Sequence, residues 1–271
     1  MQGQAGQAAA SNQEAVWSTV EALRSRSPLV HNITNFVAMD LAANVLLAIG
    51  ASPVMAHAQE EVADMVAIAG ALTINIGTLE PEWVVAMELA ANAATNLRKP
   101  WVLDPVGAGA TRYRDNTLRT LLGKLPTVIR GNGSEIMALR GQSAARGVDS
   151  ANDSTDALGV AKSLAKELGA VVAVTGATDY VTDGTRVAAI GNGHVLMTRV
   201  TAAGCGLTTV VGATLALGLS PFDATVHALA LYGIAGELAA EGAEGPGTFR
   251  ARFLDKLATL DRKAIGRLKL E

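Results

Sequence analysis

The sequence predicts an α/β fold in which a mostly parallel sheet lies between layers of helices. Helix-like and strand-like segments alternate along most of its 271 residues. The β-rich runs, such as 171–174, are continuously apolar, which is typical of strands buried on both faces of a parallel sheet. Hydrophobic residues make up 49% of the chain and glycines number 28, so we expect a large core with close helix–sheet contacts.

The first part of the chain alternates helices with short strands. The predicted helices span 13–26, 36–49, 60–69 and 81–97. The predicted strands span 53–55, 72–76 and 101–106, with a polar turn at 31–35. Pro81 supports the start of its helix, because proline is favoured in the first helical turn.

The second part contains a departure from this alternation. Strands are predicted at 127–129 and 171–174, with a helix over 153–168 between them. Asp-Gly at 183–184 and Asn-Gly at 192–193 are strong hairpin signals. They predict strands at 180–182, 185–190 and 194–200, which would form a small antiparallel extension at one edge of the sheet. The remaining chain is predicted to be helical, with Ser220 and Pro221 starting one helix.

We expect a single domain over residues 15–271, because no linker-like stretch divides the chain. Residues 1–14 are rich in Gln, Ala, Gly and Ser, and we expect a flexible tail there rather than a signal peptide. No apolar run reaches the roughly 18 residues that a membrane span needs, so no membrane partner is expected.

Charge and cysteine content favour a cytoplasmic enzyme that acts on small molecules. The net charge is −3 and no basic stripe is present, which argues against a nucleic-acid partner. The single cysteine, Cys205, cannot form an internal disulfide or a zinc cluster, as expected in a reducing compartment.

The most informative stretch runs from Thr201 to Thr209 and leads into the apolar run 210–219. Small residues at the start of a helix leave its first N–H groups unpaired and leave room for a phosphate. The positive end of the helix dipole adds to the attraction for an anion. Cys205 lies in the middle of this stretch, where a group that takes a proton from an alcohol would be needed.

Polar residues follow several predicted strands, and in open α/β sheets ligands bind beyond the carboxyl ends of strands. Five such places are Asn75–Thr78, Asp104–Gly107, Arg130–Glu135, Thr175-Gly176 and Thr201–Cys205. They supply two carboxylates, an arginine, glycine-bearing turns and a helix start. This set suits phosphoryl transfer, which depends on positioning and charge neutralisation.

Other enzyme classes receive less support. There is no P-loop motif, and the Gly204–Gly206 segment lacks the third glycine of a dinucleotide fingerprint. The four histidines show no i, i+4 pair of the kind found in zinc hydrolases. A Cys–His hydrolase with Cys205 as nucleophile and His31 or His57 as base remains open, because such partners need not be close in sequence.

Seven motifs, in order and at comparable spacing, resemble those of the hydroxyethylthiazole kinase family. They are Pro28–Val37, Pro53–Met55, Asn75–Thr78, Asp104–Gly109, Arg130–Ile136, Val174–Gly176 and Thr201–Cys205. The resemblance covers about residues 17–240. Cys205 stands where most relatives have aspartate, and Ala202 stands where the family motif Thr-Gly-x-Gly-Cys has glycine.

The resemblance implies a ribokinase-like three-layer α/β/α fold. It implies an enzyme that uses ATP and Mg²⁺ to phosphorylate the hydroxyethyl alcohol of a methylthiazole in the salvage of thiamine. It also implies a homotrimer with active sites at subunit interfaces. The alternatives are a hydroxymethylpyrimidine or related vitamin-precursor kinase of the same fold, and a non-catalytic protein that binds thiazole or thiamine.

The resemblance also assigns roles to individual residues. Substrate would be bound by Met55, Asn35, Gly77 and Ala202. ATP and its phosphates would be bound by Arg130, Thr175 and Gly204. Mg²⁺ would be held by Asp104 and Glu135. Cys205 would be the catalytic base, and a modest one, because the helix start would lower its pKa while an incoming phosphate would oppose that effect.

Overall fold

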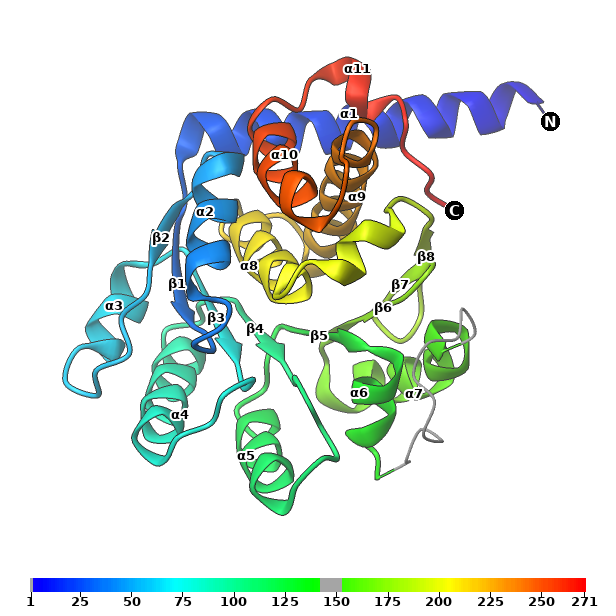
Figure 1. Cartoon of the computed structure of the whole chain (residues 1–271). Coiled ribbons are helices and arrows are strands. Elements are labelled where there is room, and N and C mark those ends of the chain that lie inside the picture. Colours follow the sequence, from blue (N-terminus) through cyan, green and yellow to red (C-terminus); the bar gives the residue numbers. More distant parts are fainter. Residues whose placement is uncertain (1, 142–152) are drawn as a thin grey trace.

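The computed structural model describes residues 2–141 and 153–271, and Met1 of the expected tail lies outside these ranges. Within them the strands form an eight-stranded sheet in the order β2-β1-β3-β4-β5-β6-β7-β8 (Figure 1). The strands are β1 (Leu29–Ile33), β2 (Ser52–Val54), β3 (Ala71–Asn75), β4 (Trp101–Asp104), β5 (Val128–Asn132), β6 (Val171–Thr175), β7 (Asp179–Thr182) and β8 (Val187–Ile190). Strands β1 to β6 pair in parallel, whereas β7 and β8 are antiparallel. The mostly parallel sheet with an antiparallel edge is therefore confirmed.

Helices cover both faces of this sheet. They are α1 (Gln2–Arg26), α2 (Met39–Ile49), α3 (Val62–Ile68), α4 (Pro81–Asn96), α5 (Arg112–Leu122), α6 (Gly133–Ala138), α7 (Asp153–Leu168), α8 (Ala203–Leu215), α9 (Pro221–Ala240), α10 (Pro246–Ala258) and α11 (Arg262–Ile265). Figure 1 shows α8, α9 and α10 on one side of the sheet and α4 to α7 on the other. Buried apolar clusters fill both helix–sheet spaces, which confirms the three-layer architecture.

The first helix is longer than predicted. It begins at Gln2, so residues 2–14, where we expected a flexible tail, lie in a helix. Gln and Ala are good helix formers, and their abundance before Gln13 accounts for the extension. The C-terminal part of the helix is anchored in the core by Val16, Val20 and Leu23, all of which are buried.

Strand β1 includes residues that we predicted to lie in a turn. His31 and Asn32 are buried within the strand, which lies between β2 and β3. Their polar groups have local partners: His31 Nε2 lies 2.8 Å from the carbonyl oxygen of Ala56, and Asn32 donates to the carbonyl of Val30. A buried polar residue that is hydrogen-bonded fits a central strand, so the predicted turn begins too early.

The predicted third strand of the antiparallel extension, 194–200, is wrong. The chain instead forms the 3₁₀ helix η1 (Val195–Arg199). His194 accepts a hydrogen bond from the Leu196 N–H through Nδ1, at 3.2 Å, and this side-chain cap starts a helical turn where the Asn-Gly hairpin signal predicted a strand.

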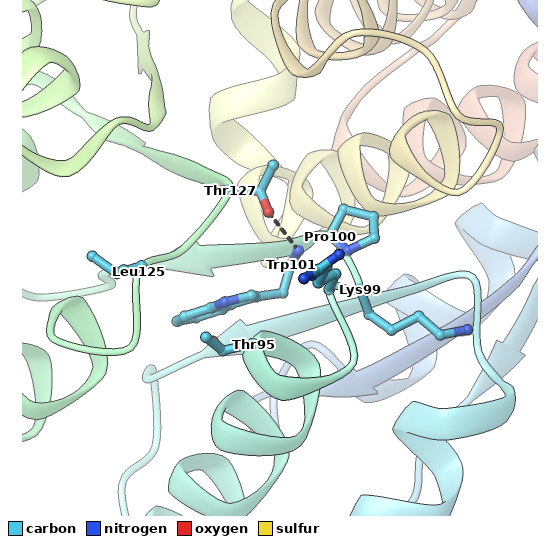
Figure 2. Close-up of a pocket in the computed structure, with 7 residues that line it drawn as sticks. Thr95, Lys99, Pro100, Trp101, Leu125 and Thr127 are labelled. Atoms are coloured by element: carbon cyan, nitrogen blue, oxygen red, sulfur yellow. Dashed lines mark hydrogen bonds between the residues drawn. The ribbon is translucent and has the colours of Figure 1, made fainter.

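The described ranges contain no helix with the length and apolar character that crossing a bilayer requires. A cavity of about 300 Å³ lies at the amino end of β4, where Trp101 and Thr127 line it together with Thr95 and Leu125. Figure 2 shows these side chains around the hydrogen bond from the Trp101 N–H to Thr127 Oγ1. Trp101 begins β4 and Asp104 ends it. The cavity therefore lies at the amino ends of the strands, whereas the candidate site lies at their carboxyl ends.

Candidate active site

The carboxylate of Asp104 lies at the centre of the site, at the carboxyl end of β4, and is fully buried. Its Oδ2 accepts hydrogen bonds from Asn75 Nδ2 at 2.8 Å and from Thr208 Oγ1 at 2.7 Å. Arg130 Nη1 lies 3.7 Å from the same oxygen. The other oxygen, Oδ1, is buried without a hydrogen-bond partner among the described residues.

This environment changes the protonation of Asp104. Burial raises the pKa of the carboxyl to about 6, the charge of Glu135 adds to the rise, and Arg130 opposes it. The donors on Asn75 and Thr208 also favour the ionised form. The buried charge is therefore only partly compensated by the protein, which leaves it able to attract a cation.

Arg130, on β5, joins three elements of the site. Its side chain is 10% exposed, and Nη2 donates to Thr175 Oγ1 at the end of β6 at 2.7 Å. A Cβ added to Gly204 would lie 3.0 Å from Nη1, so the guanidinium packs closely against the start of α8. A side chain at Gly204 would therefore require the Arg130 guanidinium to move by a few tenths of an ångström.

The turn before α8 has the geometry predicted for an anion site. The main-chain N–H groups of Gly204 and Cys205 have no hydrogen-bond acceptor among the residues that the structure describes. Thr201 is exposed, and Ala202 and Gly204 are half-buried, so the turn is not covered by other side chains. Unpaired N–H groups next to a buried guanidinium can bind a phosphate.

This turn is held in place from behind and is conformationally strained at one residue. The buried Tyr232 hydroxyl donates to the carbonyl of Ala203 at 2.6 Å. A Cβ on Gly206 would lie 2.7 Å from that hydroxyl oxygen, which explains the glycine there. Ala202 has φ 67° and ψ 10°, a left-handed conformation that favours glycine.

The Cys205 thiol is half-buried and faces the amide of Asn35, whose Nδ2 lies 3.4 Å from Sγ. The same Nδ2 donates to Asn75 Oδ1 at 2.8 Å, so Cys205 and Asp104 are connected through two asparagines. Burial, and then the charge of Asp104, raise the pKa of the thiol. We expected the helix start to lower this pKa, but the raising effects of burial and of Asp104 are larger.

Glu135 has two hydrogen bonds to the backbone. As the third residue of α6 it forms a capping box with Asn132, whose N–H donates to Oε2 at 2.9 Å. Its Oε1 accepts from the N–H of Gly107, in the loop after β4, at 3.1 Å. Glu135 therefore fixes the loop that follows Asp104.

The expected substrate residues lie at the same edge of the sheet. Gly77 follows β3, and a Cβ on it would lie 2.6 Å from Asn35 Nδ2, so its backbone lies directly against that side chain. Met55 follows β2 and is half-buried. The structure brings Asn35 and Gly77 together with Cys205, and it places Met55 at the neighbouring strand end.

A cleft of about 690 Å³ opens beside these residues. Its lining includes Phe36, His57 and Trp83. Phe36 is the residue after Asn35, and His57 comes two residues after Met55. The Phe36 and Trp83 rings meet edge to face with their centroids 4.3 Å apart. The cleft is also lined by Gln59 and by the carboxylates of Glu60, Glu80 and Glu82, so it combines aromatic rings with a largely polar wall.

Three polar residues that we did not select from the sequence contribute to the site. Asn75 and Thr208 orient Asp104, and both occur in stretches that the strand-end and helix-start patterns had marked. Asp179 accepts from the N–H of Gly176 at 2.9 Å, and burial raises its pKa to about 6. The positive charge of Arg130 opposes this rise, which links Asp179 to the site electrostatically.

The hydrolase alternative has no geometric support. In residues 2–141 and 153–271 no hydrogen bond joins a histidine to the Cys205 thiol. His31 is bound to the carbonyl of Ala56, and His57 bonds to the carbonyl of Met55 and stacks on Trp83. A cysteine nucleophile needs a base within hydrogen-bonding reach.

The carboxylates fit a divalent cation that is shared with a nucleotide. Among the described residues no group of three His, Cys, Asp or Glu side chains could form a complete protein cage. Mg²⁺ is usually held by one or two carboxylates and by substrate phosphates. Oδ1 of Asp104 is buried and has no hydrogen-bond partner among the described residues, and the Glu135 carboxylate is close enough to raise the pKa of Asp104, so the two carboxylates fit this kind of site.

Comparisons with known proteins agree with this geometry. The model of the hydroxyethylthiazole kinase family matches residues 20–263. A hydroxyethylthiazole kinase of Rhizobium johnstonii is 55% identical over 248 residues, covering 91% of this chain and 93% of its own. One from Cereibacter sphaeroides is 54% identical over 249 residues, covering 92% and 95%.

Solved structures give the same result for the fold. The structure of a hydroxyethylthiazole kinase protein from Pyrococcus horikoshii OT3 is 43% identical, with a TM-score of 0.87 over 94% of this chain and 98% of that one. An ADP complex of Bacillus subtilis pyridoxal kinase is 20% identical, with a TM-score of 0.58 over 77% of this chain and 91% of that one, and it shows the fold alone. These neighbours support the ribokinase-like fold.

Proposed function

This chain belongs to the hydroxyethylthiazole kinase family, and on that premise we propose that it transfers the terminal phosphoryl group of ATP to the hydroxyethyl alcohol of a methylthiazole. The product would be the thiazole phosphate used in thiamine salvage. One observation carries the proposal: the unpaired N–H groups of Gly204 and Cys205 lie beside the Arg130 guanidinium, whose Nη1 is 3.7 Å from the buried Asp104 carboxylate.

The phosphate side of the site is formed by Gly204, Arg130 and Thr175. Two main-chain donors and a guanidinium can share the charge of the transferred group, which spreads over its equatorial oxygens in phosphoryl transfer. The hydrogen bond from Arg130 to Thr175 fixes the guanidinium and leaves Nη1 toward Gly204. Arg130 and Thr175 would thus bind ATP through its phosphates.

Asp104 and Glu135 would hold Mg²⁺, with Asp104 contributing its unpaired Oδ1 and Glu135 acting directly or through water. When bound, the ion supplies positive charge to the phosphates of ATP. Asn75 and Thr208 keep Oδ2 of Asp104 occupied, so they orient the carboxylate with Oδ1 free.

The alcohol would lie between Met55 and the turn at 201–206. A thioether against a sulfur-containing aromatic ring is a favourable contact. Asn35, Gly77 and Ala202 would border the alcohol, and the positions of Asn35 and Gly77 near the thiol support this assignment.

In the reaction the alcohol oxygen forms a bond to the γ-phosphorus while the bond from that phosphorus to the β–γ bridging oxygen breaks. ADP leaves with the electron pair, and the alcohol proton passes to Cys205 Sγ. Because burial raises the pKa of this thiol, its thiolate fraction is small and Cys205 is a modest base. Positioning of the reactants therefore accounts for most of the rate.

We also propose that the enzyme is a cytoplasmic homotrimer with active sites at the subunit interfaces. Phe36 and Val37, which follow Asn35, are 58% and 60% exposed. Large apolar side chains exposed beside a site favour contact with another protein surface. Light scattering after size-exclusion chromatography tests this, and a monomer at micromolar concentration would contradict it.

The proposed activity is tested with purified protein, ATP, Mg²⁺ and hydroxyethylthiazole, with detection of the phosphorylated thiazole by mass spectrometry. Hydroxymethylpyrimidine in a parallel reaction tests the alternative kinase, and calorimetric binding of the thiazole without turnover would identify a non-catalytic binder. We expect thiazole phosphate, with a much lower rate for the pyrimidine. Preferential phosphorylation of the pyrimidine, or binding without product, would contradict the proposal.

A further inference from the structure

Arg114, on α5, makes three hydrogen bonds to main-chain carbonyls of two separate loops. Its Nη1 donates to the carbonyl of Ile76 at 2.6 Å and to that of Val106 at 2.9 Å. Its Nη2 donates to the carbonyl of Gly77 at 2.7 Å. Ile76 and Gly77 follow β3, and Val106 follows β4, so one side chain joins the two strand ends.

The two loops carry different parts of the proposed site. The loop after β3 contains Gly77, whose backbone lies against Asn35 and thereby next to the thiol. The loop after β4 follows directly on Asp104 and includes Gly107, whose N–H donates to Glu135. The distance between the alcohol and the metal-binding carboxylates therefore depends on how these loops are held together.

Arginine is suited to holding two loops together for a geometric reason. The guanidinium is planar and presents its N–H groups in a fixed fork, so it can serve several acceptors at once. Lysine would keep the charge, but its single ammonium nitrogen is a point donor on a flexible stem. It would not hold three carbonyls in the same relative positions.

Contacts in the first turn of α5 hold Arg114 itself in position. The Thr111 hydroxyl accepts from the N–H of Arg114 at 3.3 Å as the helix cap. Asp115 Oδ1 accepts from the N–H of Gly109 at 2.8 Å, which ties the same helix to the loop after β4. Gly107 has φ 71°, and a Cβ there would touch the Arg114 side chain at 3.5 Å. The loop thus packs against the Arg114 side chain.

We propose that Arg114 is a positioning residue that sets the alcohol-binding loop against the metal-binding loop for phosphoryl transfer. The inference rests on the proposed function. Among the described residues Arg114 makes no hydrogen bond to Arg130 or Thr175, so its effect falls mainly on the alcohol and on the metal-binding loop, and reaches ATP only through the shared cation.

The test compares the wild type with Arg114→Lys and Arg114→Gln. Arg112→Lys is the matched control, because Arg112 is exposed on the same helix. Steady-state kinetics give kcat and the KM values for the thiazole alcohol, ATP and Mg²⁺. Hydrogen–deuterium exchange gives the protection of segments 76–78 and 106–110 without requiring turnover.

We expect Arg114→Lys to lower kcat/KM for the alcohol by about 10- to 100-fold, the range that small misplacements of reactants cause, with a clearly smaller change in KM for ATP. Exchange in both segments should be faster than in the wild type and in Arg112→Lys. Unchanged kcat/KM for the alcohol, an equal loss toward ATP, or unchanged exchange in both variants would overturn the role.

Loss of the folded state in both variants would make Arg114 a folding residue and would also overturn it. If the wild type itself forms no thiazole phosphate, the proposed function fails. In that event the exchange measurement still decides whether Arg114 holds the two loops.

Discussion

Thr208 and Asp104 are 104 residues apart in the chain and are joined by a hydrogen bond of 2.7 Å. The bond connects α8, whose first turn forms the anion site, to the end of β4, which carries the buried carboxylate. Phosphate-binding and metal-binding elements are thereby held in one fixed arrangement. The arrangement has an energetic cost, because it keeps a carboxylate away from water.

Asp104→Asn should make the protein more stable and inactive. Burial raises the pKa of Asp104 from its ordinary value near 4 to about 6, so the folded chain binds an extra proton between these values. This extra proton adds to the free energy of unfolding at pH values below the ordinary pKa. The contribution is lost as pH rises through about 6. At pH 8, without Mg²⁺ or ATP, the variant should gain about 1–3 kcal/mol in urea unfolding, by the scale of 1.4 kcal/mol per pKa unit.

The gain should shrink as pH falls from 8 to 5, because the wild-type carboxyl then takes up its proton. Asp64→Asn, at an exposed position on α3, serves as the control and should leave stability within about 0.5 kcal/mol. A less stable Asp104→Asn at pH 8 would show that the protein compensates this charge fully.

Cys205→Ala should fold and slow turnover by about 10–1000-fold, which brackets the usual contribution of a general base. Since burial and Asp104 raise the pKa of the thiol, kcat of the wild type should rise with pH in the alkaline range, and this rise should be lost in the variant. Cys205→Asp should retain activity, because a carboxylate can also take the proton. Turnover of Cys205→Ala at the wild-type rate would remove the assigned role.

Arg130→Lys should weaken ATP binding more than alcohol binding. The substitution removes the hydrogen bond to Thr175 and the contact with the turn at Gly204. A charge-assisted hydrogen bond contributes about 1.5–3 kcal/mol, so KM for ATP should rise roughly 10- to 100-fold. Arg119→Lys, at an exposed position on α5, is the control. Equal rises in KM for both substrates would argue against a phosphate-binding role.

Ala202→Gly should stabilise the protein. Ala202 has a left-handed backbone conformation, which costs an L-residue with a Cβ about 1–2 kcal/mol and costs glycine little. Urea unfolding should therefore show a gain of about 1 kcal/mol. Ala203→Gly, one residue later in right-handed helix, should instead lose about 0.5–1 kcal/mol. A loss of stability in Ala202→Gly would indicate that the methyl group makes contacts that outweigh the strain.

The sequence allowed the sheet and most helices to be predicted, because apolar runs and helix starts are local signals. Ser220 is one example, since its hydroxyl caps α9 through the N–H of Asp223 as expected. The errors occurred where a local signal was overridden. His31 is polar but lies in a central strand, because the carbonyl of Ala56 provides a partner that only the fold brings close.

The outline of the candidate site could also be predicted, from the geometry of a parallel sheet. Strand ends of a parallel sheet meet at one edge, so Asp104, Arg130 and Thr175 were expected to gather, and the structure places them together. The raised pKa of Asp104 and the partnership with Thr208 could not be predicted, because they depend on burial and on contacts between distant segments.

The assignment of Glu135 illustrates the limit of a motif. The spacing from Asn132 to Glu135 is that of a capping box, and the structure forms one. The additional bond to Gly107, which brings this carboxylate to the loop after Asp104, involves a residue 28 positions away. The local pattern indicates the helix start, whereas the link to the site appears only once the strands are arranged.

A crystal structure with a non-hydrolysable ATP analogue, Mg²⁺ and hydroxyethylthiazole would show whether the turn at 201–206 receives the transferred phosphoryl group next to the alcohol. We expect the γ-phosphate within hydrogen-bonding distance of the Gly204 and Cys205 N–H groups, with the substrate hydroxyl directed at Cys205 Sγ. A nucleotide whose phosphates lie away from this turn, or an alcohol bound at the opposite edge of the sheet, would contradict the account.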